Sequence, residues 1–167
     1  IRNHYVGRTF VEPTQQIRSL GVKLKHNINK SLVKNKSIIL IDDSLVRGTT
    51  SVKIIKMLYE SGAKEVHLRI ASPPIKYPDY YGVDTPSKNE LLASKLNIEE
   101  MRKFINAKTL NFLSIEGLYK AMGYEKRNSS YPQFTDHCFT GDYPIDPVDA
   151  NNKNFISNKL SIMSSKA

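Results

Sequence analysis

The sequence predicts an α/β protein with an open, mostly parallel sheet flanked by helices. The short apolar run Ser37–Ile41 is rich in β-branched residues, which is typical of a strand buried on both faces in such a sheet. Thr49–Ser61 has apolar residues at helical spacing and is followed by Gly62, a common helix stop. A second apolar run, Val66–Ala71, comes next. The three segments therefore form a βαβ unit.

Two segments precede this unit. Residues Ile1–Gln16 are polar and aromatic without a clear period, which indicates a loop or lid. Gln15–Lys30 carries Ile17, Leu20 and Leu24 on one face of a possible helix, with basic residues around them.

The chain after the βαβ unit alternates loops, helices and one strand. Ser72–Pro86 is rich in proline and predicts a structured loop. Periodic apolar residues predict helices at Ser87–Leu96, Ile98–Ile105 and Ile115–Met122, with a strand at Thr109–Leu113. The chain is turn-rich from residue 128 onward. We expect one domain over residues 1–145 and a weakly structured tail over 146–167.

Composition limits the possible functions. The 167 residues have the length of one domain, and no apolar run is long enough to span a bilayer. The single cysteine, Cys138, excludes an internal disulfide and favours a reducing compartment, so we expect a cytoplasmic protein. The net charge of +9 suits a polyanion, whether nucleic acid or a small phosphorylated substrate, although lysine-rich composition alone could also produce it.

Two adjacent carboxylates, Asp42 and Asp43, come directly after the first predicted strand. The carboxyl end of a parallel strand faces the crevice where ligands bind in open α/β sheets. Crowded carboxylates repel each other, so a divalent cation or a pair of ligand hydroxyls would stabilise them. The acid pair therefore predicts a metal or hydroxyl site at this edge of the sheet.

The loop after the acid pair predicts a phosphate site. The amides of Ser44–Thr50 and the start of the next helix would face the same crevice, and oriented N–H groups bind anions. Gly48 allows a close backbone approach, and Thr49 and Thr50 could cap the helix. Hydroxyls or metal on one side and a phosphate on the other describe a ribose 5-phosphate.

Three other interpretations fit less well. A lone acid pair is usually part of a capping turn without a ligand, but here a Gly-Thr-Thr loop follows on the same turn. A phosphorylation-receiver domain would leave the first 37 residues unexplained, and Asp84 does not follow a buried strand. A nucleotide-binding P-loop requires a lysine that Gly48-Thr49-Thr50 lacks.

The segment IILIDDSLVRGTT at residues 38–50 resembles the fingerprint of the type I phosphoribosyltransferases, which bind 5-phosphoribosyl 1-pyrophosphate (PRPP). Four further segments, in this order and spacing, resemble the amidophosphoribosyltransferases: RNHYVGRTFVEPTQQIR at 2–18, GVKLK at 21–25, SPPIKYPDYYGVDTPSKNELLAS at 72–94 and CFTGDYP at 138–144. The resemblance covers the chain to about residue 144. It implies a type I phosphoribosyltransferase fold that is incomplete at its N-terminus.

The resemblance also implies an activity. Members of this family are glycosyltransferases that form 5-phosphoribosylamine from PRPP and glutamine-derived ammonia, with release of pyrophosphate, in the first committed step of purine synthesis. The alternative is a PRPP-sensing regulatory protein of the same fold, because some purine-responsive DNA-binding repressors use it and the net charge of +9 would suit one.

The family's functional residues can be carried over to matching positions. Asp42 and Asp43 would contact Mg²⁺ and the ribose hydroxyls. Residues 1–16 would be a lid that closes over PRPP and shapes an ammonia channel. The lid's Tyr5 would line the channel, with core packing as the alternative, and Arg8 and Lys25 would contact pyrophosphate. The 5-phosphate would lie against Ser44, Leu45, Val46, Arg47, Gly48, Thr49 and Thr50.

The sequence departs from the family pattern in three ways. It contains no glutaminase domain, so ammonia would come from an N-terminal domain that is missing here. The first strands of the phosphoribosyltransferase domain should also lie upstream, so we expect the chain to be an inactive fragment. Some members bind an iron–sulfur cluster through four cysteines, but Asp79 and Thr135 occupy two of those positions and only Cys138 matches. We therefore expect no cluster.

The partners follow from the same resemblance. We expect PRPP, ammonia and purine nucleotide inhibitors as ligands, and a homo-oligomer when the protein is full length. We expect neither nucleic acid nor a membrane as a partner.

Overall fold

The computed structural model describes residues 28–145 and 147. Their elements follow in the order α2 (Lys30–Val33), β1 (Ser37–Asp42), α3 (Thr49–Glu60), β2 (Glu65–Ile70), η2 (Lys88–Glu90), α4 (Leu92–Lys95), α5 (Ile98–Ile105), β3 (Thr109–Phe112), α6 (Ile115–Ala121) and α7 (His137–Thr140). The predictions for β1, α3, β2, α5, β3 and α6 agree with these bounds to within one residue.

The three strands form one parallel sheet in the order β1-β2-β3. Asp42, the last residue of β1, pairs with Ile70 of β2, which in turn pairs with Phe112 of β3. The three strands therefore end together, and their carboxyl ends form one edge of the sheet. The predicted open parallel sheet is confirmed.

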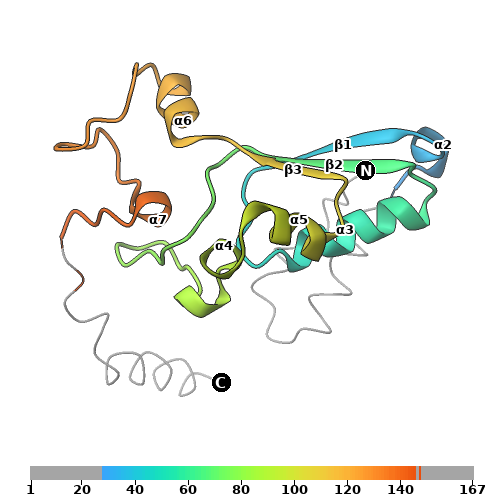
Figure 1. The fold of residues 1–167 in the computed structure, drawn as a ribbon, viewed down its shortest axis with the longest axis horizontal. Coiled ribbons are helices and arrows are strands. Elements are labelled where there is room, and N and C mark those ends of the chain that lie inside the picture. The colour runs from blue at the N-terminus through green and yellow to red at the C-terminus, as the bar shows by residue number, and fades with distance from the viewer. Residues whose placement is uncertain (1–27, 146, 148–167) are drawn as a thin grey trace.

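Helices α3 and α5 cover one face of the sheet (Figure 1). Alternate residues of β2 and β3 point to this face, and they pack with apolar residues of the two helices. The centre of this core consists of Ile55, Leu58, Val66, Leu68, Ile70, Met101, Ile105 and Leu110. Burial of these side chains supplies most of the energy that holds the βαβ unit together.

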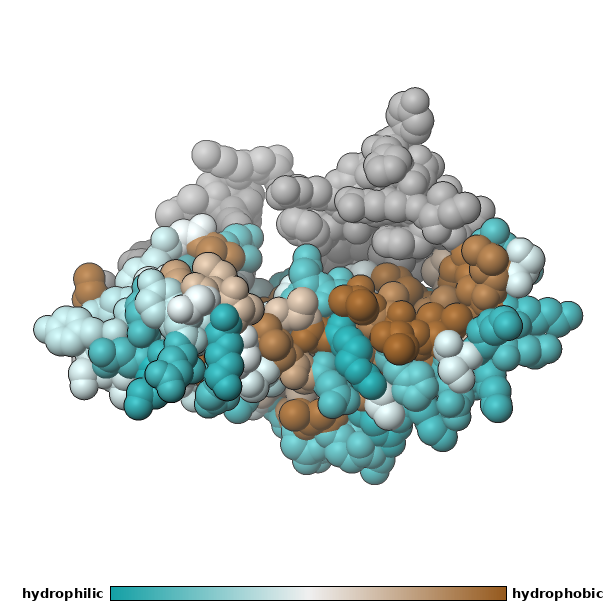
Figure 2. All heavy atoms as spheres, turned by 90° about the horizontal axis from the view of Figure 1, so that it is seen from above, coloured by the Kyte–Doolittle hydropathy of each residue, from teal (hydrophilic) through white to brown (hydrophobic). Residues whose placement is uncertain are grey.

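The opposite face of β1 is exposed in the described part of the chain. Ile39 is 66% exposed and Ile41 is 72% exposed, and Leu32 of α2 is 70% exposed nearby in sequence. Figure 2 shows hydrophobic side chains gathered over the end of the molecule where β1 and α2 lie. The expectation that this strand is buried on both faces is therefore wrong for the described residues, because β1 is an edge strand and the described helices α3 and α5 cover only its other face.

The predicted helix at Ser87–Leu96 is interrupted. A short 3₁₀ turn, η2, is followed by Leu91 in an extended conformation, and α4 begins at the next residue. Leu91 is fully buried, and the amide of Leu92 donates to the carbonyl of Val46 at 2.8 Å. Tertiary packing of Leu91 and Leu92 thus overrides the local helical pattern.

The last elements extend beyond the carboxyl ends of the strands, where α6 and α7 lie away from the sheet (Figure 1). The amides of Lys76 and Tyr77 donate to the carbonyl of Cys138 at 2.9 and 3.1 Å, which joins the proline-rich loop to α7. Sequence analysis expected only turns here and missed α7. Within the described part of the chain, none of the helices has the length and hydrophobicity that a bilayer span requires.

Candidate functional site

The acid pair lies at the carboxyl edge of the sheet. Asp42 ends β1 and is partly exposed, whereas Asp43 is exposed in the loop that follows. The Asp43 amide donates to Oδ1 of Asp42 at 3.1 Å, and the Ser44 hydroxyl donates to Oδ1 of Asp43 at 2.9 Å. Both carboxylates therefore have fixed neighbours while Asp43 stays open to solvent.

Residues 43–48 form the connection between β1 and α3, which we call the β1–α3 loop. Leu45 anchors the loop because its side chain is only 2% exposed and belongs to the core. The carbonyl of Val46 accepts the amide of Leu92. The Arg47 guanidinium contacts Glu90 through Nε at 3.2 Å and Nη2 at 3.1 Å. The loop is thus fastened to the core, to Glu90 and to the first residue of α4.

Gly48 is required by both the conformation and the packing of the loop. Its φ of +76° lies in the left-handed region, and a Cβ here would lie 2.9 Å from Cδ2 of Leu92 and 3.2 Å from Cε1 of Phe104. Any side chain at this position would strain the backbone and displace its neighbours. Glycine at residue 48 therefore lets the loop approach α4 and α5 without backbone strain or displacement of Leu92 and Phe104.

Among the described residues, no side chain caps the N-terminus of α3. Gly48 is the N-cap residue, and Thr49 and Thr50 are the first two helical residues, so the predicted capping by these threonines is wrong. The first turn of α3 also contains no acidic residue. The amides at this end therefore meet neither a capping side-chain oxygen nor a carboxylate from their own turn, which favours an external anion.

The two carboxylates of the acid pair suit Mg²⁺, which needs few protein ligands, better than a metal ion that needs three or more. No group of three or more His, Cys, Asp or Glu side chains suited to a metal ion occurs among the described residues. Mg²⁺ is commonly held by one or two carboxylates, with water and substrate phosphates completing its octahedral shell. Asp42 and Asp43 supply that number of carboxylates beside the predicted phosphate site.

Comparisons with known proteins show which proteins this chain resembles. No family model matches the chain. The amidophosphoribosyltransferase of Rhizobium etli is 58% identical over 166 residues, which is 99% of this chain. The enzyme of the same name from Bacillus subtilis is 49% identical over 146 residues.

The chain is a relative of the amidophosphoribosyltransferases. It spans 33% of the length of the R. etli protein and 30% of the B. subtilis protein, so it corresponds to about a third of these relatives. The matched region is their C-terminal phosphoribosyltransferase part. The resemblance stated from the sequence is confirmed.

Solved structures of two relatives confirm the fold of this chain. The B. subtilis glutamine PRPP amidotransferase complexed with ADP and GMP matches with a TM-score of 0.71 and 49% identity, over 86% of this chain and 31% of that one. A structure of the allosteric regulatory enzyme of purine biosynthesis matches with a TM-score of 0.67 and 46% identity, over 86% of this chain and 31% of that one. The type I phosphoribosyltransferase fold is therefore confirmed.

Several predicted site residues lie outside the described residues. These are Tyr5, Arg8 and Lys25, together with the lid at residues 1–16 and most of the tail at residues 146–167. The described structure does bring together Asp42, Asp43, Ser44, Leu45, Val46, Arg47, Gly48, Thr49 and Thr50, because they are consecutive along the strand end, the β1–α3 loop and the start of α3.

Sequence analysis missed a buried acid–histidine pair. Oδ2 of Asp79 lies 2.6 Å from Nε2 of His137, which is buried, and the Asp79 side chain is 10% exposed. The ring of Tyr143 stacks on the His137 ring at 5.1 Å, and the ring of Tyr81 meets it edge-on at 5.0 Å. The comparison with cluster-binding members singled out Asp79, but nothing in the sequence indicated its partner 58 residues away.

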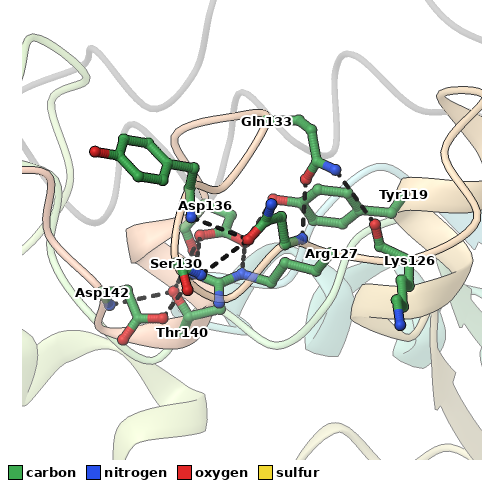
Figure 3. Close-up of polar contacts among 10 residues, drawn as sticks. Tyr119, Lys126, Arg127, Ser130, Gln133, Asp136, Thr140 and Asp142 are labelled. Atoms are coloured by element: carbon green, nitrogen blue, oxygen red, sulfur yellow. Dashed lines mark hydrogen bonds and ion pairs between the residues drawn. The ribbon is translucent and has the colours of Figure 1, made fainter.

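Salt bridges from Arg127 join the segment before α7 to the end of the described chain. The Arg127 guanidinium contacts Asp136 through Nε at 2.6 Å and Asp142 through Nη2 at 2.6 Å. Tyr119 of α6 donates its hydroxyl to Asp136 at 2.9 Å, as Figure 3 shows. Burial alone would raise the pKa of Asp136, but Arg127 and Tyr119 outweigh it and hold this pKa below its usual range.

Proposed function

We propose that this chain is the PRPP-binding part of an amidophosphoribosyltransferase that forms 5-phosphoribosylamine from PRPP and ammonia with release of pyrophosphate. The ammonia would come from a glutaminase domain of the longer protein. This reaction is a pentosyl transfer and the first committed step of purine synthesis. The similarity to the R. etli and B. subtilis enzymes supports the assignment.

The observation that carries the proposal is the order of groups at the carboxyl edge of β1. Two carboxylates come first, then a loop held by Leu45 and Gly48, then a helix start that no side chain of the described part of the chain caps. A ribose 5-phosphate presents hydroxyls at one end and a dianion at the other. The carboxylates suit the hydroxyls, and the loop amides with the start of α3 suit the phosphate.

The proposed roles follow from charge changes during the reaction. The bond from C1 of the ribose to the pyrophosphate oxygen breaks, the oxygen keeps the electron pair, and ammonia forms the new C–N bond and loses a proton. Positive charge builds on the ribose, and the carboxylates of Asp42 and Asp43 would stabilise it. A bound Mg²⁺ would neutralise negative charge on the leaving pyrophosphate, and the same two carboxylates would hold it.

The remaining assignments complete the proposal. Residues 1–16 would close over PRPP and exclude water, with Tyr5 lining the ammonia path and Arg8 and Lys25 contacting pyrophosphate. We expect the full-length protein to be a cytoplasmic homo-oligomer that purine nucleotides inhibit. The B. subtilis relative, solved with ADP and GMP, supports the last expectation.

The experiment replaces each acid with its neutral isostere in the full-length protein. Asp42→Asn and Asp43→Asn should each weaken PRPP binding in the presence of Mg²⁺ by about 2–3 kcal/mol, the usual scale for a charged contact in an active site. Glutamine hydrolysis should persist. Calorimetry gives the affinity, and thermal unfolding of the ligand-free protein should show little change.

The matched control is Asp84→Asn, which removes one exposed carboxylate from the proline-rich loop. It should bind PRPP normally. Normal PRPP binding by the Asp42 and Asp43 variants, or loss of binding only through unfolding, would show that the acid pair is structural. Tight, sequence-specific binding of duplex DNA at physiological salt would instead favour the PRPP-sensing alternative.

A further inference from the structure

Glu90 and Leu92, just before α4 and at its first residue, meet the β1–α3 loop at three consecutive loop residues. The Leu92 amide donates to the Val46 carbonyl, Glu90 contacts Arg47, and Cδ2 of Leu92 lies 2.9 Å from the position that a Cβ on Gly48 would take. The loop's conformation therefore depends on residues about forty positions further along the chain.

Glu90 is itself held in place. Its Oε1 accepts from Arg47, and its Oε2 accepts the Ser87 hydroxyl at 3.1 Å. Burial alone would raise the pKa of Glu90, but the hydrogen bonds from Ser87 and Arg47 outweigh it and lower this pKa. The carboxylate is therefore ionised at neutral pH, and each of its oxygens has a fixed donor.

We propose that Glu90 is a positioning residue that acts through Arg47 to hold the β1–α3 loop in the conformation that receives the phosphate of PRPP. This inference rests on the proposed function. Glu90 need not touch the substrate. It fixes the guanidinium on the exposed side of the loop, while Leu45 fixes the buried side.

The pair contributes more to local order than to global stability. The Arg47 side chain is 47% exposed and that of Glu90 is 50% exposed, so solvent screens their attraction. Loss of such a pair rarely unfolds a protein. Loss of the Arg47–Glu90 pair does remove the only side-chain contact of Arg47 in the described part of the chain. Arg47 lies between Leu45, which is buried in the core, and the start of α3.

Removal of Glu90 should change PRPP affinity in opposite directions depending on whether Glu90 acts only through its charge or by positioning the loop. If Glu90 acted only as a nearby negative charge, its removal would tighten the binding of an anion. If it positions the loop, its removal loosens the amides that bind the phosphate and weakens binding. The direction of the change therefore separates the two explanations.

The test uses the full-length protein and calorimetry with PRPP and Mg²⁺. Glu90→Ala should weaken PRPP binding by about two- to fivefold, the range expected for a half-exposed ion pair. Glu90→Gln should partly restore binding because its amide oxygen still accepts from Arg47. Amide hydrogen exchange in residues 44–50 should be faster in Glu90→Ala than in the wild type, because the loop is no longer held by the Arg47–Glu90 contact.

Glu99→Ala is the matched control. Glu99 pairs with Arg102 at 2.6 Å on the surface of α5, so this variant loses one negative charge and one ion pair without touching the loop. It should keep wild-type affinity and wild-type exchange in residues 44–50. In an Arg47→Ala background, Glu90→Ala should add no further loss, because the contact has already gone.

Each other outcome overturns the inference. Unchanged or tighter binding by Glu90→Ala would refute positioning, and so would an equal loss in Glu99→Ala. An additional loss in the Arg47→Ala background would refute the route through Arg47. A wild-type protein that does not bind PRPP would instead refute the proposed function. In that case faster amide exchange in Glu90→Ala would still show that the Arg47–Glu90 contact holds the β1–α3 loop. Should Glu90→Ala fold poorly, Glu90→Gln is measured by the same two readouts, and wild-type values in both would count against the proposal.

Discussion

Oδ2 of Asp79 and Nε2 of His137 lie 2.6 Å apart although 58 residues separate them in the chain. The contact fastens the proline-rich loop to α7. The amides of Tyr81 and Val83 also donate to Asp79, at 2.8 and 3.1 Å. This carboxylate is therefore the point at which the loop closes on itself and on the C-terminal segment.

The first prediction concerns the pH dependence of this contact. Burial alone would raise the pKa of Asp79, but the amides of Tyr81 and Val83 and the His137 ring outweigh it and lower this pKa. The carboxylate thus stabilises the fold above its ordinary pKa of about 4, and this contribution is lost as the pH falls through the lower folded value. Asp79→Asn should remove that acid sensitivity and cost about 1.5–3 kcal/mol at neutral pH.

The measurement is the rate at which a thiol reagent labels Cys138, which adjoins His137. Local opening should make labelling at least about tenfold faster in Asp79→Asn at pH 7. Asp84→Asn, an exposed acid in the same loop, is the control and should label at the wild-type rate. Equal rates in all three proteins would mean that the pair does not hold the loop to α7.

The second prediction concerns Arg127. Its side chain is largely buried and contacts both Asp136 and Asp142, so Arg127→Ala should destabilise the segment around α7 by about 3 kcal/mol or more because it leaves the buried Asp136 without its cation. Arg127→Lys should be intermediate, since an ammonium group lacks the planar fork. Hydrogen exchange in residues 136–142 reports the loss. Lys126→Ala, an exposed neighbour, should leave exchange unchanged.

The third prediction separates two costs at Gly48. Gly48→Ala should lose about 1–2 kcal/mol of stability from its positive φ, and more from the clash with Leu92 and Phe104. Gly123→Ala should lose only the stability that a positive φ costs, because its φ is +87° and a Cβ there meets nothing within 4 Å. Denaturant unfolding should therefore rank Gly48→Ala as the less stable variant. If the two variants lose equal stability, the close approach at Gly48 is not a packing constraint.

The fourth prediction is that the purified full-length protein contains no iron and no acid-labile sulfide bound through this chain. Asp79 is already paired with His137, and burial raises the pKa of the Cys138 thiol, so neither group is poised to bind a cluster. Elemental analysis and sulfide assay check this. Stoichiometric iron that disappears in a Cys138→Ser variant would contradict it.

Local patterns were enough to predict the elements of the sheet layer. The β-branched run of β1 and the periodic apolar residues of α3 and α5 carry their own signals, and each forms where the pattern indicates. The placement of Asp42, Asp43 and the β1–α3 loop follows from those elements, because a strand that leads into a helix leaves its loop at the sheet's edge.

Contacts between distant segments could not be predicted in the same way. Arg47 and Glu90 are 43 residues apart, and the pairing of Asp79 with His137 depends on how a proline-rich loop folds back. The break at Leu91 has the same origin, since burial of this side chain overrides a helical pattern. α7 was missed because four residues are too few to show a period.

The open side of β1 has a practical consequence for work with residues 28–145 on their own. In the described sheet, β1 pairs only with β2, so its other edge offers unpaired backbone groups beside the exposed Ile39 and Ile41. An edge strand that also exposes apolar side chains can recruit further strands and promote aggregation. Ile39→Lys or Ile41→Lys would place a positive charge on the exposed face of this edge strand, and either change should raise the yield of monomeric material from such a truncated product.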